Sequence, residues 1–305
     1  MNFTIEILEY LKKSYENATN KQMISDLDMN SKQAPYYFRF LEDNLIEPMS
    51  EVTLKRYSQA DGNELEQKMK ALRSSSAMTY NIIGNDHVIV KDSSQYFIPG
   101  KYQVFFEGQL PTLKRNPRKA NMDVFLKSEQ ELIFCEMKMT EWLFNKPGVL
   151  KESYFDRNRY FDADAFQAFS SCLDKIVLEE PTDYGTYHSA LEQYDALQMY
   201  KHTLAVYNYV MKNKGNIPSV IRLVNCVWHL PETDFLSEDA KVFYETKEMC
   251  EYKEFIFFYK ATEEIRKRFE KLGFDFDILF LDAKEFVQQL SKNSEQLEYL
   301  KRYFL

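Results

Sequence analysis

The 305-residue chain is poor in glycine, and that shortage narrows what it can do. With only 8 glycines it has little room for the glycine-rich loop that cradles nucleotide phosphates, and no Walker-type motif is present. We therefore expect no ATP dependence within this polypeptide. The G-x-S-x-G elbow that marks many serine hydrolases is also missing.

Cysteine and histidine are scarce as well, and their spacing argues against zinc and disulfide frameworks. The four cysteines are Cys135, Cys172, Cys226 and Cys250. None forms a C-x-x-C pair, and two of them lie in apolar, strand-like runs, so we predict buried free thiols in a reducing cytoplasm. The four histidines are His87, His188, His202 and His229, and they are scattered without zinc-ligand spacing.

Long apolar runs are also missing, because no stretch approaches the roughly 18 residues that a membrane-spanning helix needs. The first residues are amphipathic and acidic, unlike a signal peptide. We expect a cytoplasmic protein with no membrane contact. The chain is 45% hydrophobic and 15% aromatic, so it can bury a sizeable core.

The net charge of -8 argues against a general coat of nucleic acid. It does not exclude a nuclease, because a local basic patch can make the contacts. The candidate DNA-binding loop contains Lys114, Arg115, Arg118 and Lys119, just ahead of Asp123. Solvated loop charges are the alternative interpretation of these four residues.

The first 58 residues read as a helical segment. Apolar periodicity predicts a helix over 5–15, and cap and turn signals favour two more over 19–30 and 31–46. A tight "DMNS" turn between the last two is typical of a helix-turn-helix, although the third helix carries only one arginine, Arg39. A structural cap on the next domain is the alternative. The polar stretch 49–63 predicts a linker, which gives domains 1–58 and 59–305.

After the expected linker, the sequence predicts a helix over 64–84, followed by strands. The strands are "HVIV", "YQVFFEGQL", "MDVFL" and "LIFCEMKM", the last two joined by the turn "KSEQE". Helical periodicity returns over 161–178, 189–212 and 240–273. Between the last two lies the strand candidate 219–230, and 276–290 reads as strand, turn and helix. Helices before and after a mixed sheet favour an α/β sandwich.

The strands "MDVFL" and "LIFCEMKM" are expected to form a hairpin, and this hairpin carries charged residues where a buried sheet should be apolar. Period-two alternation puts Glu136 and Lys138 on one face. Strand pairing can bring Asp123 and Glu136 together at one end of the sheet. Two adjacent carboxylates repel unless a cation lies between them, and hard oxygen ligands favour Mg²⁺ or Mn²⁺. A nearby lysine can stabilise developing negative charge, so the set suits metal-assisted phosphodiester hydrolysis. An incidental Glu–Lys pair on a surface hairpin is the alternative.

The pattern Asp123…Glu136-x-Lys138, on paired strands after a helix, resembles the PD-(D/E)XK nuclease superfamily. The stretches "DGNELEQKMKALRSSSAMTYN" and "ANMDVFL…LIFCEMKMTEW" look like a restriction-endonuclease-like bacterial group, from about Asp61 to the strand at 220–228. The resemblance implies an α/β/α core with a mixed sheet behind an N-terminal helical segment. It also implies a Mg²⁺-dependent endonuclease acting on double-stranded DNA. Met122 stands where the superfamily's name has proline.

The resemblance also implies roles for individual residues. Asp123 would be the central metal ligand and Glu136 the second. The Met137 carbonyl would be a third ligand, and Lys138 would position the water and stabilise the transition state. A further acid would come from Glu64, with Glu107 as its rival.

The helix after the hairpin offers further polar residues. Gln198, Lys201 and His202 share one face at i, i+3 and i+4. In the resembling family this helix often lends a polar residue to the site, so we expect Gln198 to contribute; a solvated face is the alternative. A non-catalytic DNA-binding or assembly protein that retains the fold is the second hypothesis. DNA versus RNA and the recognition sequence stay open, and a homodimer would provide two active sites for a duplex.

Overall fold

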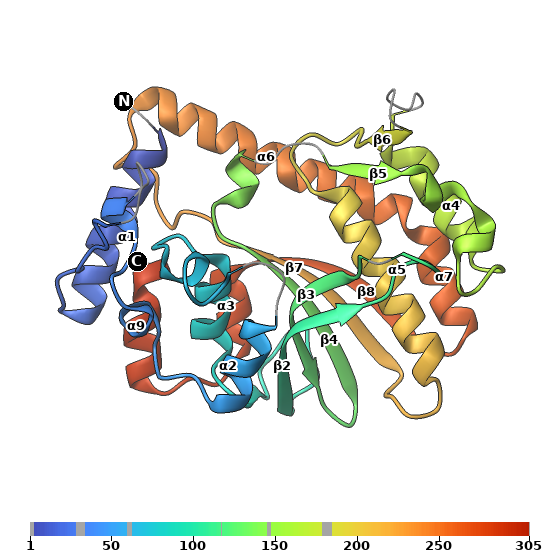
Figure 1. Ribbon diagram of the computed structural model, residues 1–305, viewed down its shortest axis with the longest axis horizontal. Coiled ribbons are helices and arrows are strands. Elements are labelled where there is room, and N and C mark those ends of the chain that lie inside the picture. The colour runs from blue at the N-terminus through green and yellow to red at the C-terminus, as the bar shows by residue number, and fades with distance from the viewer. Residues whose placement is uncertain are drawn as a thin grey trace.

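The computed structural model describes residues 3–28, 34–59, 63–116, 118–144, 148–178 and 185–304. Its centre is a six-stranded mixed sheet in the order β1-β2-β3-β4-β7-β8 (Figure 1). These strands are β1 (His87–Val90), β2 (Gly100–Leu110), β3 (Ala120–Lys127), β4 (Glu131–Lys138), β7 (Val220–Val227) and β8 (Asp275–Asp282). Strands β1 to β4 run antiparallel to their neighbours, whereas β4, β7 and β8 are parallel. The predicted mixed sheet is confirmed.

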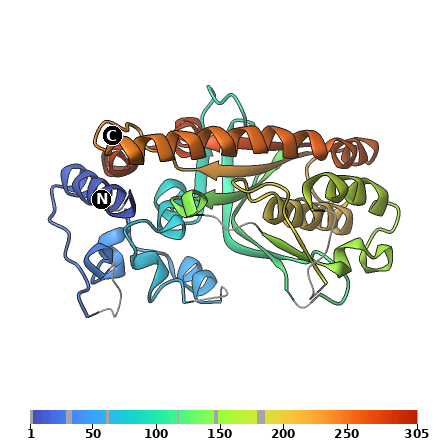
Figure 2. The same ribbon diagram turned by 90° about the horizontal axis from the view of Figure 1, so that it is seen from above.

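Helices cover both faces of this sheet, as the second view shows (Figure 2). One core includes residues of α1 (Phe3–Thr19), α3 (Ser75–Ile83), α8 (Ala283–Gln289) and α9 (Ser294–Phe304). The other includes residues of α4 (Phe166–Ile176), α5 (Ala196–Asn213) and α7 (Glu263–Lys271). The long helix α6 (Glu238–Ala261) contributes residues to both cores. The predicted α/β/α class is therefore confirmed.

Strand β4 is central and shows why its sequence is almost continuously apolar. Ile133, Cys135 and Met137 lie in the first core, whereas Leu132 and Phe134 lie in the second. This alternation is the one that the sequence predicts, and burial on both faces is typical of a parallel strand. A small second sheet pairs β5 (Val149–Lys151) with β6 (Thr186–His188).

The N-terminal segment departs from the sequence-based expectation after α1. The predicted second helix is wrong over its described residues: Asn20 takes a left-handed φ of 53°, and Ser25 forms a bridge with Phe38. The third is replaced by two short 3₁₀ turns, Ala34–Tyr36 and Leu41–Asn44. Side-chain and cross-segment bonds outcompete helical periodicity here. Met29–Ser31 of the expected turn lie outside the described residues.

Two further boundaries differ from the prediction. The expected linker contains helix α2 (Glu51–Ser58), whose N-terminus is capped because the Ser50 side chain accepts a hydrogen bond from Thr53 N. The expected helix from Glu64 is regular only in α3, since residues 64–70 form turns and a 3₁₀ turn. Asp61 and Gly62 lie outside the described residues.

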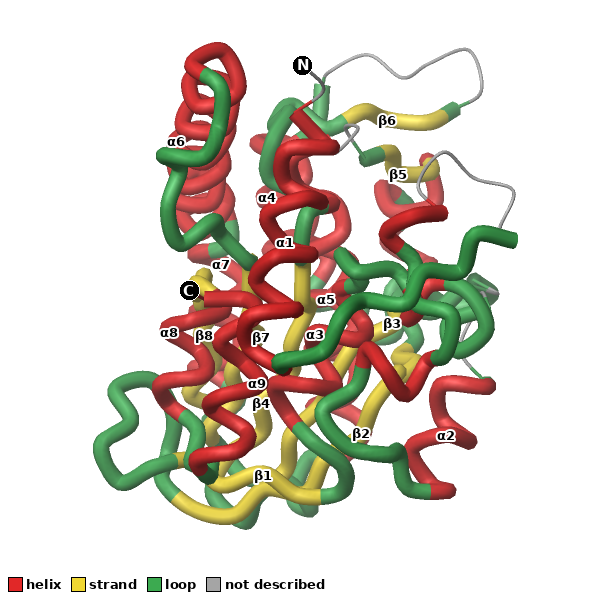
Figure 3. The backbone as a smooth tube through the Cα atoms, turned by 90° about the vertical axis from the view of Figure 1, so that its left-hand side faces the viewer, coloured by secondary structure: helices red, strands yellow, loops and turns green. Residues whose placement is uncertain are grey.

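The N-terminal segment packs closely against the C-terminal helix, as Figure 3 shows for α1 and α9. The Arg302 guanidinium of α9 lies 4.7 Å from the ring of Tyr15 in α1. Ser237, ahead of α6, donates to Glu6 of α1. The division at residue 58 stays a prediction, and these contacts tie the two sides together. Among the described residues, no helix combines the length and apolar character needed to cross a membrane.

Candidate functional site

The site begins where β3 and β4 separate. The two strands pair from Lys127–Leu132 to Val124–Cys135, and the next residues in register would be Asp123 and Glu136. There a side chain replaces the backbone acceptor of the partner strand, because Asp123 Oδ2 accepts a hydrogen bond from Met137 N at 2.7 Å. In a strand the N–H and C=O of one residue point to the same side. The Met137 carbonyl therefore faces the same opening as Asp123.

Glu136 is 3% exposed and is held by three side chains. Lys138 Nζ lies 2.6 Å from Glu136 Oε1, and Gln198 Nε2 donates to the same oxygen at 2.8 Å. The Gln198 Oε1 atom accepts from Lys138 Nζ at 2.8 Å, so the three groups close a triangle. His202 Nε2 lies 3.0 Å from the other oxygen, Glu136 Oε2. Helix α5 thus reaches both carboxylate oxygens through residues one turn apart.

The two acids have opposite electrostatic environments. Burial alone would raise the pKa of Glu136, but the charges of Lys138 and His202 outweigh it and lower that pKa to about 2. Removal from water raises the pKa of Asp123 well above its usual range, and the charges of Glu136 and Glu107 add to the rise. Asp123 is therefore the acid whose charged form lacks compensation.

Lys138 remains charged in this environment. Burial would lower its pKa, but the neighbouring carboxylates of Glu136 and Asp123 raise it above the usual value. The ammonium group is therefore a fixed positive charge at the same face as Glu136. It can donate hydrogen bonds to an anion, but it cannot act as a base near neutral pH.

A cleft of about 570 Å³ opens over these residues. Its lining includes Glu64, Asp123, Glu136, Met137 and Lys138, which are all of the predicted metal and charge-stabilising residues. Across the described parts of the chain, no three His, Cys, Asp or Glu side chains converge into a ready-made metal cluster. A cation here would be held by two carboxylates, a backbone oxygen and water, which suits Mg²⁺ or Mn²⁺.

Glu64 and Glu107 occupy different positions. Glu64 is 8% exposed, faces the cleft, and is bound by Lys68 Nζ at 2.6 Å and Ser76 Oγ at 2.9 Å. Glu107 stands opposite Asp123 on β2, where its left-handed φ of 52° interrupts the pairing. Burial and the charge of Glu64 raise the pKa of Glu107 to about 7. Of these two acids, Glu64 lines the cleft.

The predicted basic loop lies away from the cleft lining. Lys114, Arg115, Arg118 and Lys119 all lie outside the set of residues that line it. The charge of Arg118 acts on Lys201, whose pKa is lowered mainly by burial. Lys201 Nζ lies 3.4 Å from the Val149 carbonyl of β5, so Lys201 does not join Gln198 at Glu136.

The fold brings several groups to the site to which the sequence assigns no role. His202 lies on the same helical face as Gln198, as its i, i+4 spacing predicts, but the sequence gives no reason to prefer it as a partner of Glu136. Lys68 binds Glu64, and Arg73 lines the cleft with its NH1 atom 3.5 Å from Thr140 Oγ1. These two cations carry no sequence signal, because only the turn before α3 brings them to the cleft.

Comparison with known proteins gives one match. A family model described as restriction endonuclease associating with ARP matches residues 9–224, a span that runs from α1 into β7. The searches of the curated proteins and of the solved structures find no match.

Proposed function

The chain belongs to the family of restriction endonucleases associating with ARP, and from that membership we propose that it is a divalent-metal-dependent endonuclease that cuts DNA. The observation that carries the proposal is the meeting of Asp123, Glu136 and Lys138 in one cleft, where β3 and β4 separate. Buried charge of this kind is costly in a purely structural position. A cleft that concentrates it is best explained by an ionic ligand.

The donor set fits a hard cation. Asp123 and Glu136 would hold it through carboxylate oxygens, and the Met137 carbonyl and Glu64 would be further oxygen donors. The raised pKa of Asp123 supports this assignment, because a cation would offset the negative charge that burial and Glu136 make unfavourable there. Bound Mg²⁺ or Mn²⁺ would polarise the phosphate and activate an attacking water.

The chain's own residues would align the substrate and stabilise charge. Lys138 would donate hydrogen bonds to the water and to the negative charge that develops on the phosphate. Gln198 would orient both Lys138 and Glu136 through the bonds described above. Lys68 and Arg73 at the cleft would meet the nearest phosphates, and the basic loop Lys114–Lys119 would contact the backbone farther along.

Plasmid cleavage tests this proposal. Wild-type protein with Mg²⁺ or Mn²⁺ is expected to nick or linearise supercoiled DNA. Asp123→Asn and Glu136→Gln are expected to lose about 10³-fold or more of that rate. The matched control is Glu131→Gln, which removes another buried carboxylate of β4 at the far end of the strand. Equal cutting by all four proteins, or by none on any DNA substrate, would contradict the proposal.

One observation favours a second function. Lys138 Nζ already lies 2.6 Å from Glu136 Oε1, so the fold does not need a metal to balance that charge. A non-catalytic DNA-binding or assembly role would retain this arrangement, and the family description itself names an association with ARP. DNA binding that persists in Asp123→Asn, without cleavage by the wild type, would favour this second function.

A further inference from the structure

Helix α6 presents an apolar stripe to solvent along the outside of the molecule. It runs across both helical layers and stands at the outer edge in two views (Figures 2 and 3). Val242 is 57% exposed, Met249 51% and Tyr252 56%. Val242, Met249 and Ile256 recur at intervals of seven residues, so they share one side of the helix, although Ile256 is half-buried and also packs against the second core.

The opposite side of α6 already has its packing partners. Tyr244, Phe255 and Phe258 are buried in the two cores. Val242 and Met249 are therefore left without a large share of their surface buried by the fold of one chain. Exposed apolar side chains that gather on one side of a helix, with charges beside them, are a candidate protein contact site.

The charges along the stripe are symmetric about Met249. Glu245 and Lys253 lie four residues before and after it, and Glu238 and Lys260 lie eleven before and after. All four side chains are exposed. None of the four has an ion-pair partner in the part of the chain that the structure describes.

We propose that α6 binds the α6 of a second copy of this chain, antiparallel and centred on Met249. In that arrangement Val242 of one copy lies level with Ile256 of the other. Residues 245 and 238 lie level with 253 and 260, so each glutamate meets a lysine of the partner. A parallel pairing would put like charges together and align the helix dipoles unfavourably.

A two-fold axis through this helix pair gives a closed dimer, because the same surface is used by both copies. The stripe lies beyond residue 224, outside the matched family region. The inference does not rest on the proposed nuclease activity, since mass and not cleavage tests it. If that activity holds, the dimer carries two clefts.

Sedimentation or light scattering over a dilution series tests the dimer. Wild-type protein is expected to have twice the mass of one chain. Met249→Glu places two like charges at the axis and is expected to weaken the dimer by about 100-fold or more. The matched control is Leu297→Glu, which changes another apolar residue of a helix surface, 47% exposed on α9, and leaves the mass unchanged.

Charge exchange tests the antiparallel arrangement itself. Glu245→Lys and Lys253→Glu are each expected to weaken the dimer by about tenfold, whereas the double variant restores it because the opposite charges meet again. Monomeric wild type at every concentration would overturn the proposal. A dimer that ignores Met249→Glu, or a double variant no better than the singles, would also overturn it.

Discussion

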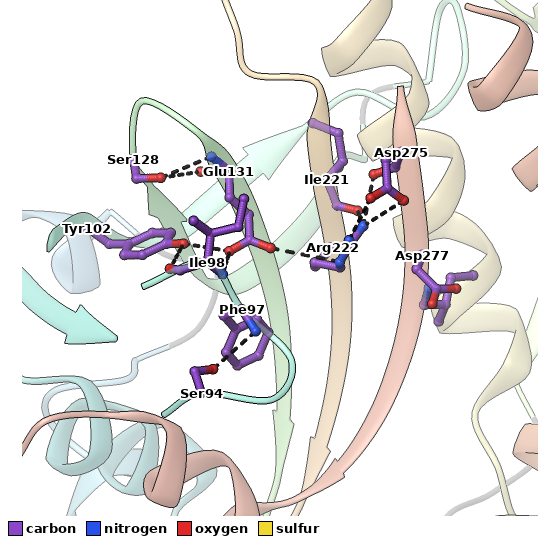
Figure 4. A network of polar contacts seen from close by, with 11 residues as sticks. Ser94, Phe97, Ile98, Tyr102, Ser128, Glu131, Ile221, Arg222, Asp275 and Asp277 are labelled. Atoms are coloured by element: carbon purple, nitrogen blue, oxygen red, sulfur yellow. Dashed lines mark hydrogen bonds and ion pairs between the residues drawn. The ribbon is translucent and has the colours of Figure 1, made fainter. Parts of the chain in front are cut away.

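Strand β4 carries a buried glutamate near each end, Glu131 with 0% and Glu136 with 3% exposure. Glu131 is enclosed by structural partners (Figure 4): its Oε2 accepts from Tyr102 Oη and from Ile98 N, and its Oε1 lies 3.8 Å from Arg222 Nε. Arg222 in turn pairs with Asp275 of β8. None of these partners of Glu131 lines the cleft, and none of them is an acid of β3 or a proposed metal ligand.

At the other end the neighbours of Glu136 are arranged around an opening. Lys138 and Gln198 bind one oxygen, and the carboxyl of Asp123 stands across the separated strands. The same residue type on the same strand thus serves as a structural anchor at one end and faces a cleft at the other. Burial alone does not identify a functional acid; a second acid and an open cleft beside it do.

The largest expected difference between the two ends is catalytic. Lys138→Met removes the positive charge beside Glu136 and is expected to lower the cleavage rate constant by about 10²–10³-fold. Single-turnover cleavage at saturating metal measures it. Arg222→Met, the matched change beside Glu131, leaves the rate constant unchanged in folded protein. A similar loss of the cleavage rate constant in both variants would contradict the expected difference between the two ends of β4.

Stability is expected to show the reverse order. Glu131→Ala leaves Ile98 N without its acceptor and Arg222 without its buried partner, and is expected to lower the free energy of unfolding by about 3 kcal/mol. Denaturant unfolding measures this loss. Cleavage by the folded fraction should persist. Lost cleavage in protein shown to be folded would contradict a purely structural role for Glu131.

His202 provides a smaller test at the cleft end of β4. His202→Gln keeps a hydrogen-bond donor but removes the ring that lies 3.0 Å from Glu136 Oε2, and we expect cleavage and metal affinity to fall by about tenfold. His188→Gln is the control, because His188 lies on β6 and not on the cleft-facing helix. Cleavage that falls without any change in metal affinity would argue against a role in positioning Glu136.

The two glutamates should also respond to pH with opposite sign in metal-free protein. Burial raises the pKa of Glu131 above 4.5, so the pH-dependent part of its stabilising contribution is complete below pH 4.5 and falls as pH rises. The pKa of Glu136 is lowered to about 2, so its contribution is present above pH 4.5 and is lost as pH falls through 2. Melting temperatures measured in EDTA across this range test both assignments. The difference between wild type and Glu131→Gln should change as pH rises above 4.5. The difference between wild type and Glu136→Gln should change as pH falls towards 2. Changes on the same side of pH 4.5 for both variants would contradict these assignments.

The strands and the hairpin could be predicted because alternation and apolar runs are local signals. The same local signals place Glu136 and Lys138 on one face of the hairpin. The wrong prediction of helices over 19–46 has a different cause, because residues far away in the sequence determine the backbone there. Tyr36 donates to Glu9, and Asn44 donates to the Met69 carbonyl. Lys68 and Arg73 join the cleft through tertiary packing that no local pattern encodes.

Titration calorimetry with Mn²⁺ tests the central claim most directly, namely that Asp123 and Glu136 together hold a divalent cation. The account predicts one site per chain in wild type, retained in Glu131→Gln and lost in both Asp123→Asn and Glu136→Gln. Undiminished binding in the last two variants, or no binding in wild type, would contradict it.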